Sequence, residues 1–111
     1  MNSAMAIYII PEWVKLLREV AELPEFSSQK TAYTRLASSM EKYAKEVEKA
    51  FLTDLGDRDF SRRAYLDSKT ILGDTSIYLE PQGFMLLSNS LDHTSKRKIY
   101  SALQRRLIDG E

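Results

Sequence analysis

The chain of 111 residues contains no cysteine and a single histidine. Disulfide bonds, thiolate metal sites and cysteine nucleophiles are therefore excluded. A Ser-His-Asp catalytic triad would have to use His93. That residue stands between Asp92 and Thr94, a context more typical of a helix cap than of a general base. Because no nucleophile and base are paired and no glycine-rich phosphate loop is present, we expect a protein that is not an enzyme and binds no cofactor.

Long apolar runs and a net charge are missing as well. No run approaches the roughly 20 apolar residues that cross a bilayer, so no membrane contact is expected. The first ten residues lack a basic region, which argues against a signal peptide. Sixteen Lys plus Arg balance sixteen Asp plus Glu, so the overall charge favours no particular partner. Together with the absence of cysteine, these features predict a cytoplasmic protein.

The remaining composition is that of an ordinary folded chain, with 43% hydrophobic and 29% charged residues. Its length suggests one compact domain over residues 1–111. The spacing of its apolar residues, described below, predicts a mainly α fold, organised as a helical hairpin or bundle with one long amphipathic helix.

The most informative segment runs from Ser28 to about Leu55. Its apolar residues recur every three or four positions and fall on one face of a helix, whereas Arg, Lys and Glu fill the other face. Such a helix must bury its stripe against other helices or against a second copy of itself. Ser27 or Ser28 could cap it, and Gly56 is a natural stop. The stripe comprises Ala32, Tyr33, Leu36, Ala37, Met40, Tyr43, Ala44, Val47, Ala50, Phe51 and Leu55.

A shorter helix precedes it and forms the other arm of the predicted hairpin. Pro11 is a favourable first helical residue, and Pro24 ends the pattern. One apolar stripe lies between them, made of Trp13, Leu16, Leu17, Val20 and Leu23. Because the connection from Pro24 to Ser27 is short, the two helices should be antiparallel neighbours.

The second half is less regular. A third helix is only loosely indicated between Phe60 and Leu72, closed by Gly73-Asp74. Residues 76–87 suggest a small β-hairpin with Pro81-Gln82-Gly83 at its turn. The alternative is a helix that begins within Gly83–Leu91. A C-terminal helix from about Ser95 to Ile108 is clearer, with Asp92 or Thr94 as its cap. We expect burial of Leu16, Leu17, Leu36, Met40, Val47, Phe51, Ile99 and Leu103.

Basic residues cluster on this last helix, where no acidic residue lies between Thr94 and Leu107. Arg97, Lys98 and Arg105 share the face opposite its apolar stripe. Such a face can bind the phosphate backbone of a nucleic acid, and Arg62 and Arg63 could extend it. The simpler interpretation is a solvated surface whose positive charges are balanced by nearby aspartates. A winged-helix arrangement is compatible with the element order, but the long second helix argues against it.

Acidic residues gather at Asp54, Asp57 and Asp59, close to Glu48. Oxygen ligands suit Mg²⁺ or Ca²⁺, but the spacing lacks the glycine and the final glutamate of a calcium loop. Aspartates around a glycine usually cap helices and form turns. We therefore expect no metal site, and carboxylate catalysis at this junction is a distant alternative.

Two functional hypotheses follow from these observations. The first is a non-catalytic interaction or regulatory protein, such as a small adaptor or inhibitor of bacterial or phage origin. It would bind a protein partner through the long helix, and a homodimer is one form of that interaction. The alternative is a nucleic-acid-binding regulator that uses Arg62, Arg63, Arg97, Lys98 and Arg105.

Overall fold

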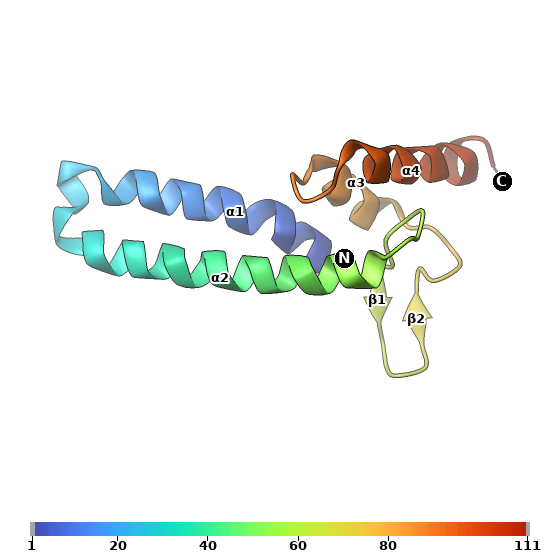
Figure 1. Cartoon of the computed structure of the whole chain (residues 1–111), viewed down its shortest axis with the longest axis horizontal. Coiled ribbons are helices and arrows are strands. Elements are labelled where there is room, and N and C mark those ends of the chain that lie inside the picture. The colour runs from blue at the N-terminus through green and yellow to red at the C-terminus, as the bar shows by residue number, and fades with distance from the viewer. Residues whose placement is uncertain (1, 111) are drawn as a thin grey trace.

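The computed structural model describes residues 2–110 and confirms a mainly α fold with a long helical hairpin (Figure 1). Two short strands lie between the hairpin and the last helices. In chain order the elements are α1 (Asn2–Ala21), a 3₁₀ turn (Pro24–Gln29), α2 (Lys30–Leu55), β1 (Ala64–Tyr65), β2 (Ile71–Leu72), α3 (Leu79–Leu87), α4 (His93–Leu103) and a π-helical turn (Gln104–Ile108).

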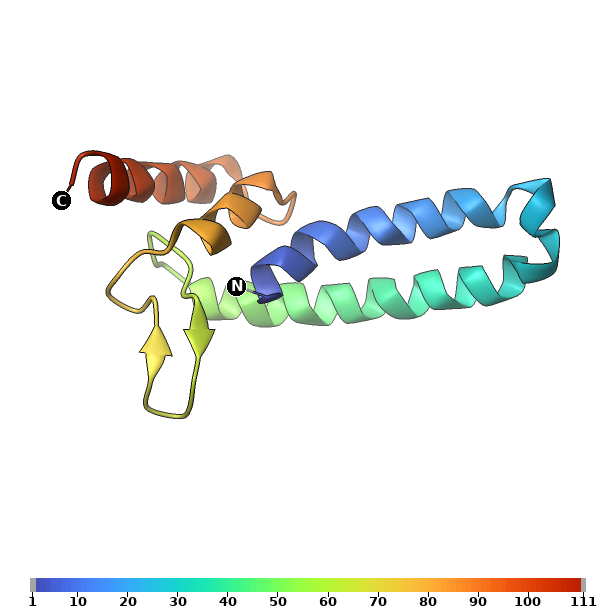
Figure 2. The same ribbon diagram turned by 180° about the vertical axis from the view of Figure 1, so that it is seen from behind.

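The molecule is a long, thin slab that measures 56 × 30 × 18 Å. The α1–α2 hairpin extends to one side, and the strands, α3 and α4 form a head at the other end (Figures 1 and 2). In its backbone packing, α2 contacts only α1 and the 3₁₀ turn, whereas α3 lies against both α1 and α4. No described helix is long and apolar enough to span a bilayer.

The hairpin agrees with the predicted antiparallel pair, but its ends differ. Helix α1 begins at Asn2 and continues through Pro11, so Pro11 is not its first residue. The proline ring removes one backbone hydrogen bond there, which the helix tolerates. Neither Ser27 nor Ser28 caps α2, because a 3₁₀ turn leads directly into it. Gly56 ends α2 as predicted, with φ of 48° and its N–H donating to the carbonyl of Leu52.

The predicted third helix and the β-hairpin at 76–87 are both wrong. Residues 60–63 are irregular, and the two strands at 64–72 form the sheet, with Ala64 opposite Leu72 and Tyr65 opposite Ile71. Asp67 stabilises the strand connection, because its carboxylate accepts the backbone N–H groups of Lys69 and Thr70. These bonds hold the pKa of Asp67 below its ordinary value.

Helix α3 occupies most of the segment that alternation assigned to a β-hairpin. Pro81 lies in the first turn of this helix, where its missing N–H costs nothing. The Pro-Gln-Gly sequence therefore starts a helix instead of a tight turn. Gln82 and Met85 then lie on the same buried face of α3.

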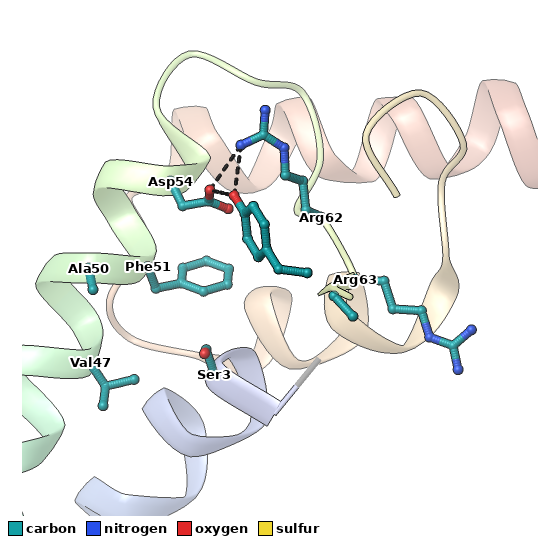
Figure 3. A pocket seen from close by; sticks show the side chains of 9 residues that line it. Ser3, Val47, Ala50, Phe51, Asp54, Arg62 and Arg63 are labelled. Atoms are coloured by element: carbon teal, nitrogen blue, oxygen red, sulfur yellow. Dashed lines mark hydrogen bonds and ion pairs between the residues drawn. The ribbon is translucent and has the colours of Figure 1, made fainter. Parts of the chain in front are cut away.

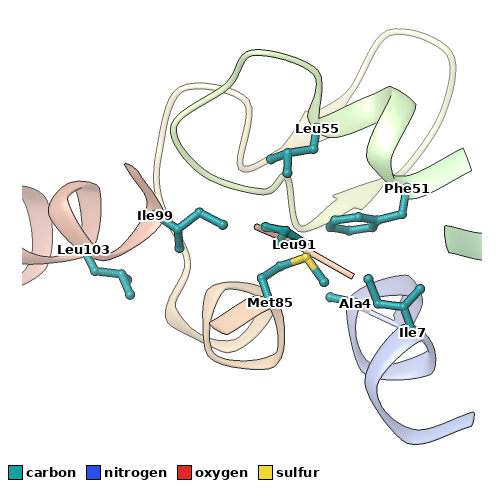
Figure 4. Packing of buried hydrophobic residues seen from close by; sticks show 8 residues of the cluster. All are labelled: Ala4, Ile7, Phe51, Leu55, Met85, Leu91, Ile99 and Leu103. Carbon is teal, nitrogen blue, oxygen red and sulfur yellow. The ribbon is translucent and has the colours of Figure 1, made fainter. Parts of the chain in front are cut away.

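The main cluster of buried side chains lies where the base of the hairpin meets α3 and α4 (Figure 4). Met85 and Ile99 are almost completely buried there. The predicted burial of Phe51, Ile99 and Leu103 is confirmed, and Leu17, Met40 and Val47 are half-buried. The cluster consists of Ala4, Ile7, Phe51, Leu55, Met85, Leu91, Ile99 and Leu103.

The C-terminal helix is confirmed, although it begins at His93 and ends in a π-helical turn. Asp92 caps it, with its carboxylate accepting the N–H of Ser95 at 2.8 Å. The pKa of Asp92 is lowered by this hydrogen bond, because only the charged carboxylate is a full acceptor. His93 is exposed at the first helical position.

Candidate interaction surfaces

The two arms of the hairpin pack through residues spaced seven apart. In α1 these are Ile7, Val14 and Ala21, and in α2 they are Ala37, Ala44 and Phe51, all buried. A seven-residue spacing is the repeat of a coiled coil, in which one seam of each helix faces the partner. Most of the α2 seam is alanine, which lets the two helices approach closely.

A second apolar stripe lies beside this seam and remains open to solvent. On α1 it contains Ile9, Trp13 and Leu16, and on α2 it contains Leu36 and Tyr43, each between 45% and 57% exposed. We call these five residues the apolar face. The expected burial of Leu16 and Leu36 is therefore wrong within one chain, because a two-helix hairpin buries only one narrow seam of each helix.

All five residues lie on the same side of the hairpin. Trp13, Leu36 and Tyr43 each precede a buried seam residue by one position, which places them on one flank of the antiparallel pair. The opposite flank is polar, and there Arg18 of α1 forms an ion pair with Glu41 of α2 at 3.1 Å. The hairpin thus has one apolar side and one charged side.

A groove of about 700 Å³ lies at the base of the hairpin, beside Ala50 and Phe51 of α2 (Figure 3). On its polar wall, Asp54 accepts hydrogen bonds from Arg62 Nη1 at 2.9 Å and from the Tyr65 hydroxyl. The bond to Asp54 raises the pKa of Tyr65, since it favours the protonated phenol. These three side chains thus form one hydrogen-bonded cluster on the wall of the groove.

Arg62 is held on its other side by Asp74, whose carboxylate accepts from Nε at 2.8 Å. Arg58 donates to the same carboxylate at 3.2 Å and to the carbonyl of Gly73. Gly73 has a φ of 84°, and a Cβ there would stand 2.7 Å from the backbone nitrogen of Arg63. Two arginines and one glycine thus close the loop from α2 to β2, which is a structural role.

The structure does not bring the five predicted basic residues into one surface. Arg62 and Arg63 line the groove at the base of α2, and the guanidinium of Arg63 stacks on Tyr78 at 4.8 Å. Arg97 and Lys98 of α4 and Arg105 of the π-helical turn line a separate groove of about 360 Å³. Asp59 shares that second groove and lies 3.9 Å from Arg105.

The acidic junction does not gather into a metal site within residues 2–110. Asp54 is bonded to Arg62 and Tyr65, and Asp59 faces Arg105. Glu48 lies on α2 and accepts from the hydroxyl of Ser90. Each of these carboxylates thus has a neighbour from elsewhere in the fold.

Comparisons with protein-family models, with curated proteins and with solved structures found no match. The apolar face does not stand out in the sequence pattern, where Trp13, Leu16 and Leu17 form one stripe. The spacing does separate two stripes. Ile9 and Leu16 are seven residues apart, and Ile10 and Leu17 form a second seven-residue repeat that is shifted by one position.

Proposed function

We propose that this protein is a non-catalytic interaction module that binds a protein chain through the apolar face. One observation carries the proposal: five large apolar side chains collect on one side of a hairpin whose other side is charged. The largest exposed apolar patch of a soluble protein is often a binding site, because its burial is favourable by about 25 cal/mol per Å².

The shape of the hairpin also suits this role. A helical hairpin is a rigid support, and its side chains are positioned by the buried seam beneath them. Trp13 and Tyr43 add aromatic rings, which are enriched among the residues that dominate binding energy at protein interfaces. The hydrogen bonds among Asp54, Arg62 and Tyr65 at the base favour a structural role for that cluster.

A matched pair of variants tests the proposal. Leu36→Lys places a charge on the apolar face, whereas Ser38→Lys places the same charge on the polar side of α2. We expect Leu36→Lys to weaken binding of the physiological protein partner at least tenfold and Ser38→Lys to leave it unchanged. Quantitative affinity capture with wild-type and both variant chains as baits measures this. Equal capture of every protein by all three baits, further copies of this chain included, would contradict the proposal.

The groove on α4 supports a second candidate function, the binding of nucleic acid. Three basic side chains, Arg97, Lys98 and Arg105, line that groove together with Thr94 and Ser101. Lysine and arginine bind phosphates by displacing condensed counterions, and hydroxyl groups add neutral donors.

For this candidate we expect a labelled oligonucleotide to bind at low salt and to dissociate steeply as salt rises. An Arg97→Ala/Lys98→Ala variant should reduce the slope of log affinity against log salt by about 0.9 for each phosphate that the variant no longer neutralises. Fluorescence anisotropy measures both effects, with Lys45→Ala on α2 as the control. If neither DNA nor RNA binds at low salt, this candidate function is wrong.

A further inference from the structure

The hairpin is a single layer of structure with one apolar side uncovered. The molecule is only 18 Å thick, and no described element lies over the apolar face. Helices normally form domains in two packed layers, because each must bury its apolar side. If a large side chain has about 200 Å² of surface and half is open, the five residues expose about 500 Å². A stable interface buries about 800 Å² per partner, so the face and its edges are of suitable size.

The face has the spacing of a coiled-coil seam. Ile9, Trp13 and Leu16 are separated by four and three residues, and Leu36 and Tyr43 by seven. The buried seam has the same repeat. Each helix therefore has two adjacent apolar stripes, as a helix of a four-helix bundle has for its two neighbours. A surface with this repeat matches a second surface with the same repeat, and an identical chain supplies one.

Charges along the two edges of the face are of opposite sign. The outer edge of α1 carries Glu12 and Glu19, which we call the acidic rim. The outer edge of α2 carries Arg35, Lys42 and Lys49, which we call the basic rim. All five side chains are exposed. Glu46 is the one acidic residue near the basic rim, and Lys42 and Lys49 flank it on the same helix.

Two symmetric ways of stacking one face on another are available. With the two-fold axis across the hairpin, α1 lies on α1 of the second copy, and the acidic rims meet. With the axis along the hairpin, α1 lies on α2 of the second copy, so each acidic rim meets a basic rim. Like charges repel and opposite charges attract, so the second arrangement is favoured.

We propose that this protein forms a two-fold dimer in which the apolar faces of two hairpins stack into an antiparallel four-helix bundle, with both hairpin turns at the same end. The inference rests on the proposed function and names a second copy of this chain as the partner. The Arg18–Glu41 ion pair shows which residues of α1 and α2 stand side by side along the hairpin. In the proposed dimer this register places Glu19 of one chain between Arg35 and Lys42 of the other.

The oligomeric state tests the proposal first. Sedimentation equilibrium of the wild-type chain should give twice the 12.8 kDa mass of one chain. Leu36→Lys should shift the dimer dissociation constant upward at least 100-fold, because two charges would enter the interface. Ser38→Lys should change it less than threefold. Circular dichroism of each variant confirms that the helices remain. A wild-type monomer at millimolar concentration overturns the proposal.

The position of the turns tests the arrangement. Because the chain has no cysteine, Ser28→Cys at the exposed turn gives a single labelling site. With both turns at one end, spin labels should lie within about 25 Å, since packed helices are 8–10 Å apart. With the turns at opposite ends, the length of α2 would separate the labels by about 39 Å or more. A long distance in double electron-electron resonance overturns the proposed arrangement.

A charge exchange tests the rims. Glu19→Lys alone and Arg35→Glu alone should each weaken the dimer about tenfold by juxtaposing like charges. The double variant Glu19→Lys/Arg35→Glu should recover most of the loss. These two residues stand on opposite outer edges of their own hairpin, so recovery must come from contact between chains. Additive losses in the double variant contradict the rim pairing.

The outcomes also separate this inference from the proposed function. A monomeric wild-type chain whose Leu36→Lys variant loses another protein partner would refute the dimer and support the interaction module. A dimer that Leu36→Lys leaves intact would refute this interface. A monomer for which capture is the same with every bait would refute both.

Discussion

Replacing Gln82 by alanine should destabilise the protein by about 3–5 kcal/mol, more than most single substitutions. The Gln82 side chain is fully buried, and its Oε1 accepts the N–H of Ser61 at 2.7 Å. Its Nε2 donates to the carbonyls of Ser61 at 2.8 Å and Tyr78 at 2.9 Å. Alanine would leave both backbone groups of buried Ser61 without partners, and each such group costs about 1–3 kcal/mol.

Urea denaturation followed by circular dichroism measures this loss. Gln104→Ala is the control, because Gln104 is an exposed glutamine near the end of the same chain. Its substitution should change stability by less than about 0.5 kcal/mol. A Gln82→Ala variant as stable as the wild type would mean that α3 does not hold the segment after α2 in this way.

The second large effect is expected for Met85→Ala. Met85 lies at the centre of the core, is fully buried, and is surrounded by side chains from α1, α2 and α4 (Figure 4). Truncation removes apolar contacts and leaves a cavity, which together cost about 2–5 kcal/mol for methionine. This loss would be a large part of the stability of a domain of this size.

Leu87→Ala provides the matched control, because Leu87 lies two residues further along α3 and is 58% exposed. We expect it to cost less than about 1 kcal/mol. Thermal and urea denaturation of both variants measure the difference. Similar losses in the two variants would show that the cluster around Met85 is not the main core.

The hairpin was predictable because its physical determinants are local. Apolar spacing over Ser28–Leu55 defines α2, and Gly56 supplies the left-handed residue at its end. Asp92 capping α4 is equally local. The spacing did not show which parts of each apolar stripe are covered by other elements of the fold. Phe51 meets the head and is buried, whereas Leu36 lies on the same helix without a covering layer.

The head was not predictable because distant side chains hold it together. Residues 60–63 have no local reason to be irregular, but Gln82, 21 positions away along the chain, hydrogen-bonds both backbone groups of Ser61. Arg58 and Asp74 are likewise 16 positions apart. A pattern within a short window contains no information about such pairs. Pro81 was ambiguous for another reason, since proline suits both a tight turn and a first helical turn.

Of the candidate surfaces, too, only those with local determinants could be predicted from the sequence. The basic face of α4 follows from helical spacing, and Arg97, Lys98 and Arg105 do share a groove. Arg62 was grouped with them by charge alone, yet Asp54 and Asp74 hold it elsewhere. The apolar face required knowledge of which side of each helix the other one covers.

The lopsided placement of the core has a consequence for local opening. Near the 3₁₀ turn the hairpin arms contact only each other, and the rings of Phe26 and Tyr33 lie there with centroids 6.2 Å apart and planes tilted by 45°. Backbone amides in this distal part of one chain should fray at a small free-energy cost, whereas those beside Phe51 open only when the whole domain unfolds. In a monomeric chain, resistance to hydrogen exchange should therefore rise from the tip of the hairpin to its root, and the stacking of a second copy should raise it at the tip.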